Sequence, residues 1–175
     1  MEETPVTIIG IIIAAVIMFI VPVMMISDRA DDISQLVVQT ATEEFVDDVI
    51  KTGKITERRY QEFVSGLLSS GNTYEVNMEL KILDENTSKM VTDGDYTKVG
   101  NNTYYSIYTT QIEDKMNELD GELLLKQGDG ISVTVKNSSA TLSQALKSFY
   151  YNSRGESMHI IAATASGTIA INGTT

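Results

Sequence analysis

The sequence predicts an α+β protein in which a long N-terminal helix packs on a small antiparallel β-sheet head with short helices. Residues 5–26 carry no charge, and residues 27–52 continue with helical periodicity and without Pro or Gly. The remaining sequence contains short alternating stretches that are typical of strands. We therefore expect a transmembrane or filament-core helix over 1–26, its amphipathic continuation over 27–53, and an α+β globular head over 54–175.

The run at 5–26, PVTIIGIIIAAVIMFIVPVMMI, has the length of a membrane-spanning helix. At ~1.5 Å per residue it would extend about 33 Å, against about 30 Å for the hydrocarbon core of a bilayer. No Lys or Arg precedes it and it is longer than the apolar part of a signal peptide, so we expect a retained transmembrane helix. Pro5 suits the first turn, and Pro22 should kink the helix. Gly10 and Ala14 form a small-residue pair that favours close approach of another helix.

The amphipathic continuation has an apolar residue at every third or fourth position, and Gly53 provides its C-terminal stop. We expect this stripe to pack on the sheet of the head. Its members are Ala30, Ile33, Val37, Ala41, Phe45 and Val49, and Val38, Val46 and Ile50 widen it. Asp28, Asp31 and Asp32, just beyond the apolar run, are interpreted as a solvated collar.

The first elements of the head follow from capping and from period-two alternation. Thr56 can cap a short helix that Gly71 ends, and residues 74–83 alternate as a strand with one buried face. Residues 84–102 form a long polar loop, followed by a strand over 104–109 and a helix over 110–119.

The rest of the head contains one ambiguous segment. Residues 122–126 could extend the preceding helix or form a strand. After a turn at Gly128-Asp129-Gly130 we expect a strand over 131–135, a helix over 141–150, and one or two terminal strands over 159–171. The helix over 141–150 has Leu142, Ala145, Leu146 and Phe149 on one face.

Composition excludes several kinds of function. The chain has 175 residues with 13 basic and 24 acidic ones, a net charge of −11 that argues against binding nucleic acid or an anionic membrane surface. It has no cysteine and one histidine, His159, so thiolate sites and multi-histidine metal sites are excluded. Asp93-Gly94-Asp95 departs from the calcium-loop pattern and is interpreted as a solvated turn. We expect no enzymatic activity, no cofactor and no metal.

The layout of an apolar helix continued by an amphipathic one over 5–52, with a proline at position 22, resembles the type IV pilin superfamily, and most of all its tight-adherence and pseudopilin-like subunits. In that family the first half of the helix lies in the membrane before assembly and in the filament core afterwards. The family places a Glu at the fifth position of the mature chain, where this sequence has Pro5. Glu2 and Glu3 are the nearby acidic residues that the resemblance suggests for pairing with the amine of a neighbouring subunit.

The resemblance implies a structural subunit of an extracellular pilus-like filament that polymerises through its hydrophobic helix. Its partners would be copies of itself, the membrane before assembly, and the assembly machinery, at the membrane and surface of a bacterial cell. The alternative is a single-pass membrane-anchored accessory component of a secretion, conjugation or adhesion apparatus. The residues expected to serve assembly are Glu2, Glu3, Gly10, Ala14, Pro22, Ile33, Val37, Ala41 and Phe45.

Overall fold

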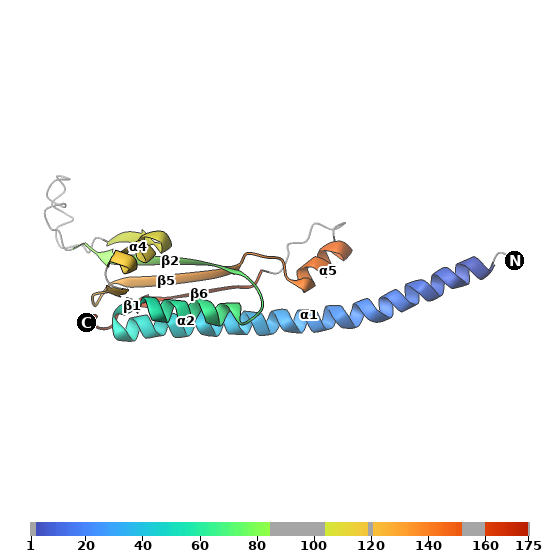
Figure 1. The fold of residues 1–175 in the computed structure, drawn as a ribbon, viewed down its shortest axis with the longest axis horizontal. Helices are drawn as coiled ribbons and strands as arrows, with labels where there is room; N and C mark the ends of the chain where they lie inside the picture. The colour runs from blue at the N-terminus through green and yellow to red at the C-terminus, as the bar shows by residue number, and fades with distance from the viewer. Residues whose placement is uncertain (1–2, 85–103, 119–120, 152–159, 175) are drawn as a thin grey trace, which may run out of the picture.

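The computed structural model describes residues 3–84, 104–118, 121–151 and 160–174. It confirms the predicted α+β class: a long helix projects from a small head made of an antiparallel sheet and short helices (Figure 1). The described elements are α1 (Glu3–Thr52), β1 (Lys54–Thr56), α2 (Glu57–Leu68), β2 (Tyr74–Leu83), β3 (Tyr104–Tyr108), α4 (Thr109–Glu118), β4 (Glu122–Leu124), β5 (Gly130–Asn137), α5 (Leu142–Tyr151) and β6 (Ala162–Thr168).

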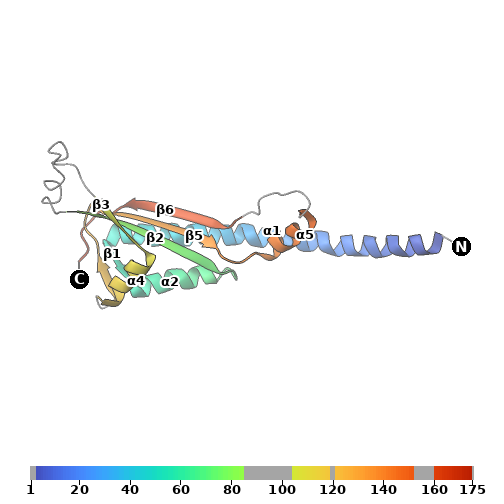
Figure 2. The same cartoon turned by 90° about the horizontal axis from the view of Figure 1, so that it is seen from above.

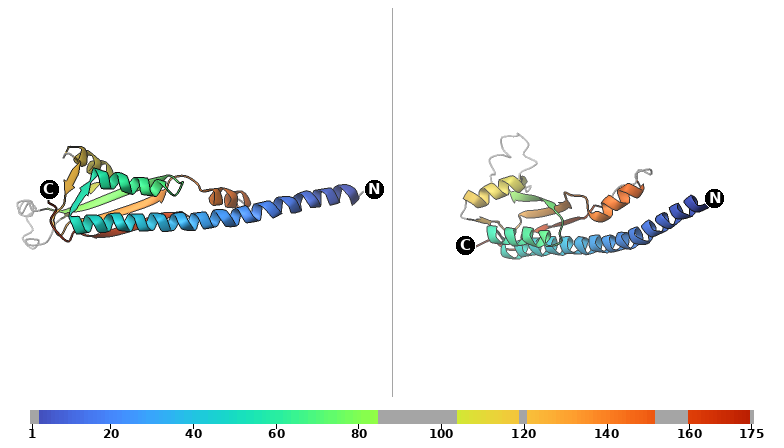
Figure 3. Two further views of the ribbon diagram at one scale, coloured as in Figure 1. Left: turned by 60° about the horizontal axis from the view of Figure 1, so that its bottom comes forward. Right: turned by 45° about the vertical axis from the view of Figure 1, so that its right-hand side comes forward.

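α1 is one helix of 50 residues that passes through Pro22 without interruption. The kink predicted at this proline takes the form of a gentle curvature of the N-terminal half (Figure 3). The helix ends at Gly53, as predicted, with a φ of 66° and a 2.8 Å bond from its N–H to the carbonyl of Val49. A Cβ at Gly53 would lie 2.5 Å from the carbonyl oxygen of Ile171, so both the dihedral angle and the space require glycine.

The main sheet has the strand order β3-β2-β5-β6, and all neighbouring strands are antiparallel. The register of β2 with β5 runs from Tyr74 opposite Asn137 to Lys81 opposite Gly130. Residues 122–124 resolve the ambiguous segment as a strand, because they pair with β1 in a separate two-stranded sheet. β6 is the terminal strand and lies at one edge of the main sheet.

The core lies between one face of the main sheet and the helices α1, α2 and α4 (Figure 2). Phe45 of α1 stacks on Phe63 of α2, with 4.6 Å between ring centroids. The N-cap of α2 is Thr56, whose side chain accepts a hydrogen bond from the N–H of Arg59, as its sequence predicts. β2 supplies the buried Met78 and Leu80. The opposite face of the sheet is polar and largely exposed, which is typical of an antiparallel sheet covered on one side.

The buried face of α1 differs from the predicted stripe at its N-terminal end. Val38, Thr42, Val46 and Val49 are fully or almost fully buried, whereas Ile33 is 64% exposed. The reason is that the head meets residues 27–35 through polar groups, which apolar periodicity does not detect. The buried residues here include Ser27 and Ser34.

The orientation of α5 also differs from what its apolar pattern suggests. Ser143 and Gln144 are buried, while Leu142 on the apolar face is 62% exposed. α5 packs on α1 rather than on the sheet, beyond the end of the core, and it uses its polar side for this contact (Figure 1).

Candidate functional site

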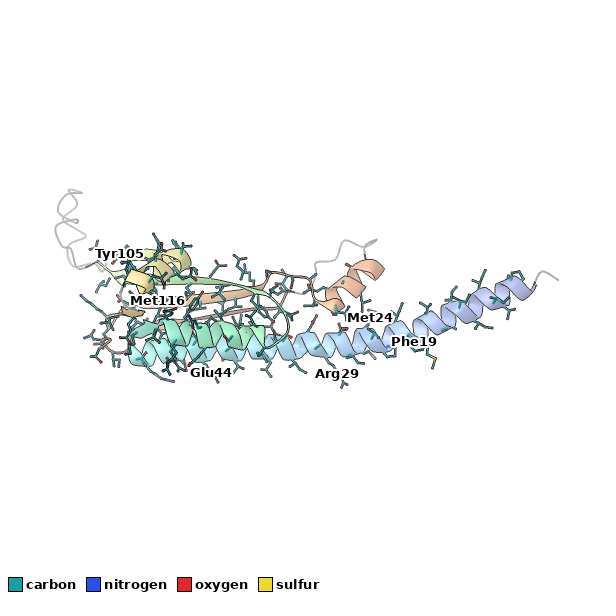
Figure 4. The ribbon with its side chains drawn as sticks, viewed as in Figure 1. Phe19, Met24, Arg29, Glu44, Tyr105 and Met116 are labelled. Atoms are coloured by element: carbon teal, nitrogen blue, oxygen red, sulfur yellow. The ribbon has the colours of Figure 1, made fainter. Side chains whose placement is uncertain are left out.

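The head leaves the apolar N-terminal half of α1 uncovered. Every residue from Pro5 to Val23 is exposed, and the most apolar window of the helix is 0% buried. Phe19 lies on this free part of the helix (Figure 4). By length and composition α1 is able to cross a membrane.

Two small residues mark one side of this exposed half. Gly10 and Ala14 are one helical turn apart, so they share a face. A Cβ placed at Gly10 would meet no atom within 4 Å. The position is therefore open, and another helix could approach its backbone closely. Pro22, the third predicted residue in this half, is exposed as well.

A second exposed apolar group lies beyond the membrane-length run. Ile33 is 64% exposed and Leu36 is 65% exposed, one turn apart on the side of α1 that does not contact the head. Sequence reasoning missed Leu36, because it lies outside the predicted stripe. The signal that could have found it is a second line at helical spacing, on which Ile26, Ile33 and Leu36 are apolar and Arg29 is charged.

The remaining predicted residues lie in different surroundings. Val37 and Ala41 are half-buried at the border of the head. Phe45 is 6% exposed and belongs to the core, so it is not accessible to another subunit. Glu3 is the first residue of α1. Glu2, the Asp93-Gly94-Asp95 turn and His159 fall outside the described residues.

Polar contacts hold the head to α1 where the apolar run ends. The hydroxyl of Thr141 donates to the carboxylate of Asp31 at 2.7 Å, and the hydroxyl of Ser143 donates to Asp28. Two of the three aspartates predicted to be solvated, Asp28 and Asp31, are thus bonded to the start of α5. Thr141 and Gln144 also form a reciprocal N-terminal cap, with bonds of 3.1 and 3.2 Å.

Gln35 makes a further polar contact, with the edge strand β6. Its side-chain amide donates to the carbonyl of Ala162 at 2.7 Å and accepts from the N–H of the same residue at 3.1 Å. The carboxamide thereby takes the place of a peptide group of a neighbouring strand. This contact fixes the first residue of β6 against α1.

A charged cleft of about 610 Å³ lies between the C-terminal end of α1 and the start of α2. A hydrogen bond from Arg59, 2.7 Å from Asp48, is the main cause that lowers the pKa of the Asp48 carboxyl, and the same contact raises the pKa of Arg59. Lys54 pairs with Glu122 at 3.4 Å in the same cleft. Opposite charges therefore compensate each other within the cleft, as in a structural ion-pair network.

The described residues include a partly buried tyrosine, Tyr60, but no cluster of metal ligands. No group of three or more His, Asp or Glu side chains in this part of the chain could hold a metal ion. Burial, together with the hydrogen bond that its hydroxyl donates to Glu113 at 2.8 Å, raises the pKa of Tyr60, which keeps this phenol neutral rather than reactive.

In comparisons with known proteins, the chain matches no protein family, no curated protein and no solved structure. The similarity to pilins is therefore one of layout: a long N-terminal apolar helix joined to a small antiparallel head.

Proposed function

We propose that the protein is a structural subunit of an extracellular pilus-like filament, in which α1 packs against α1 of other copies. The proposal depends on one observation. Beyond Ile26, and past the exposed Arg29 on the same face, α1 exposes two further apolar side chains, Ile33 and Leu36, on the side that the head leaves open. A simple membrane anchor needs only residues 5–26.

Burial of these two residues favours association. Fully burying a Leu or Ile side chain contributes roughly 1.5–3 kcal/mol, so covering the exposed part of each would contribute about 1–2 kcal/mol. Both lie outside the membrane-length run, so this gain is measured against water and not against lipid. Repetition of one such contact without closure produces a helical filament.

The small pair Gly10 and Ala14 supports the same arrangement. Between apolar helices in lipid, close packing replaces the hydrophobic effect as the driving force, and small residues allow it. The acidic composition, with a net charge of −11, would keep the surface of such a filament soluble.

The test is electron microscopy of filaments sheared from cells that produce the protein, with mass spectrometry of the sheared material. Wild-type cells should yield thin filaments that contain this chain. Leu36→Glu should abolish them, because a carboxylate would be buried between subunits. Leu68→Glu, at an exposed apolar position of α2, is the matched control and should leave them intact.

Both variants should remain in washed membranes at the wild-type level, since neither alters residues 5–26. If the wild-type chain is found in membranes and never in sheared filaments, the protein is the anchored accessory component instead. Normal filaments from Leu36→Glu would contradict the proposed packing of α1.

A further inference from the structure

α5 lies beside α1 at the level where the apolar run ends. Its first turn is bonded to Asp28 and Asp31, two and five residues beyond Ile26. At ~1.5 Å per residue these contacts lie about 3–8 Å beyond the run. The headgroup layer of a bilayer is about 5–8 Å thick on each side, so α5 begins within that layer if residues 5–26 span the membrane.

From there α5 runs toward the N-terminal half of α1, away from the sheet (Figure 1). Met24 lies next to it and is half-buried, whereas its neighbours Met25 and Ile26 are exposed (Figure 4). The C-terminal end of α5 therefore reaches the level of the apolar run itself.

The two sides of α5 differ in polarity and in exposure: the side that faces α1 is polar and buried, and the outer side is apolar and exposed. The polar residues Thr141, Ser143 and Gln144 are buried on the side of α1, and Leu142 points outward with 62% of its surface exposed. Ile160, at the start of the segment that leads into β6, is also 60% exposed. In a head surrounded by water this arrangement would leave apolar side chains exposed while polar ones are buried.

The sequence of α5 carries no acidic residue, although the turn of α1 that it contacts carries Asp28 and Asp31. The one charged residue of α5 is Lys147. The helix itself, LSQALKSFYY, ends in three aromatic residues. Basic and aromatic residues are those that favour the interface of a bilayer with anionic lipids.

We propose that α5 is a second membrane contact, which begins in the headgroup layer and reaches the edge of the hydrocarbon core with its apolar face toward lipid. The inference depends on the proposed placement of residues 5–26 in a bilayer. Lipid is favoured over a second copy of the chain by the depth of α5, by its lack of acidic residues and by its terminal aromatic residues. The contact would hold the head against the membrane surface until the subunit leaves the bilayer.

The test uses single-tryptophan variants of the full chain, which has no tryptophan of its own. Phe19→Trp reports on the apolar run, Leu142→Trp on α5, and Leu68→Trp on an exposed position of α2. Each variant is reconstituted in vesicles of phosphatidylcholine and phosphatidylglycerol, and its fluorescence is measured with and without lipids brominated at shallow or deep acyl positions.

We expect deep bromines to quench Phe19→Trp, shallow bromines to quench Leu142→Trp with a shift of its emission to shorter wavelength, and neither to quench Leu68→Trp. Quenching of Phe19→Trp without any quenching of Leu142→Trp would overturn the inference and leave the membrane span intact. If brominated lipid quenches neither Phe19→Trp nor Leu142→Trp, the placement of residues 5–26 in the membrane is itself overturned. A shifted but unquenched Leu142→Trp would mean that a second copy covers α5, which also overturns the inference.

Discussion

Gln35 joins α1 to the open edge of the sheet, and we predict that its replacement by alanine loosens this junction. Two hydrogen bonds to Ala162, at 2.7 and 3.1 Å, are lost. Each contributes about 0.5–1.5 kcal/mol net, and water can reach the freed groups because Ala162 is only half-buried. Gln35→Ala should therefore lower the free energy of unfolding by about 1–3 kcal/mol, which is about 2–12 °C in Tm for a chain of this size.

Gln35→Glu tests the geometry of the same contact. Near pH 7 the carboxylate cannot donate, and it faces the carbonyl oxygen of Ala162. A protonated carboxyl restores one donor and one acceptor, so the folded protein favours the neutral form and raises the pKa of the new group. The loss of stability should thus be present at neutral pH and shrink as the pH falls toward about 4.

The assay is thermal unfolding of the full chain in detergent micelles, followed by circular dichroism, with each variant compared with the wild type at the same pH. Gln39→Ala is the matched control: Gln39 is exposed and bonds to Glu43 on its own helix, so its loss should change the stability by less than about 0.5 kcal/mol. Equal stability of Gln35→Ala and Gln39→Ala, or a deficit of Gln35→Glu that does not shrink in acid, would refute the reasoning.

Three other substitutions test the core, the end of α1 and the charged cleft. Phe45→Ala should lower the free energy of unfolding by about 3–5 kcal/mol in urea titrations, whereas Ile33→Ala, on the exposed side, should change it by less than about 0.5 kcal/mol. Gly53→Ala should cost more than about 1 kcal/mol in the same assay, because its φ is positive and the backbone of Ile171 occupies the space for a Cβ. The pKa of Asp48 is lowered in the folded protein, so its ionised carboxylate stabilises the fold above the unfolded pKa, and this stabilisation is lost as the pH falls through the folded pKa. Asp48→Asn should therefore make Tm less dependent on pH in acid. The change in stability should be less than about 1 kcal/mol, because the pair with Arg59 is partly exposed.

Apolar periodicity predicted the elements that bury one face in the core. β2 was predicted with its observed bounds, and the cap of α2 and the end of α1 followed from Thr56 and Gly53. These elements are determined locally, by alternation, by a capping hydroxyl or by a positive φ.

The same reasoning failed where the head meets residues 27–35 of α1. There the contact is made by polar groups: Asp28 and Asp31 accept from the start of α5, Ser34 accepts from Asn72, and Gln35 bonds to Ala162. A polar side chain can face water or form a hydrogen bond with another element of the protein. The sequence pattern is the same in both cases, so only the fold shows which one occurs. For this reason Ile33 was assigned to the buried face and Leu36 was overlooked.

The candidate assembly residues divide in a similar way. Gly10, Ala14 and Pro22 were placed on a free apolar helix by their position in an uncharged run, which needs no knowledge of the head. Phe45 was included because of its spacing, but the stacking on Phe63 that buries it depends on where α2 folds back. A one-dimensional pattern identifies an apolar face without revealing whether the same chain covers it.

The way in which α1 is fixed to β6 has a mechanical consequence. Gln35 is bonded to Ala162 at one end of the contact, and the carbonyl of Ile50 accepts from the N–H of Ala170 at 3.1 Å at the other, so helix and strand run in the same direction over this length. A pull on the N-terminal end of α1 would act along both elements and load the intervening contacts together, as shear. Tension along the helix is then resisted by the whole contact with the strand at once, whereas a force directed across it would open the same contact one residue at a time.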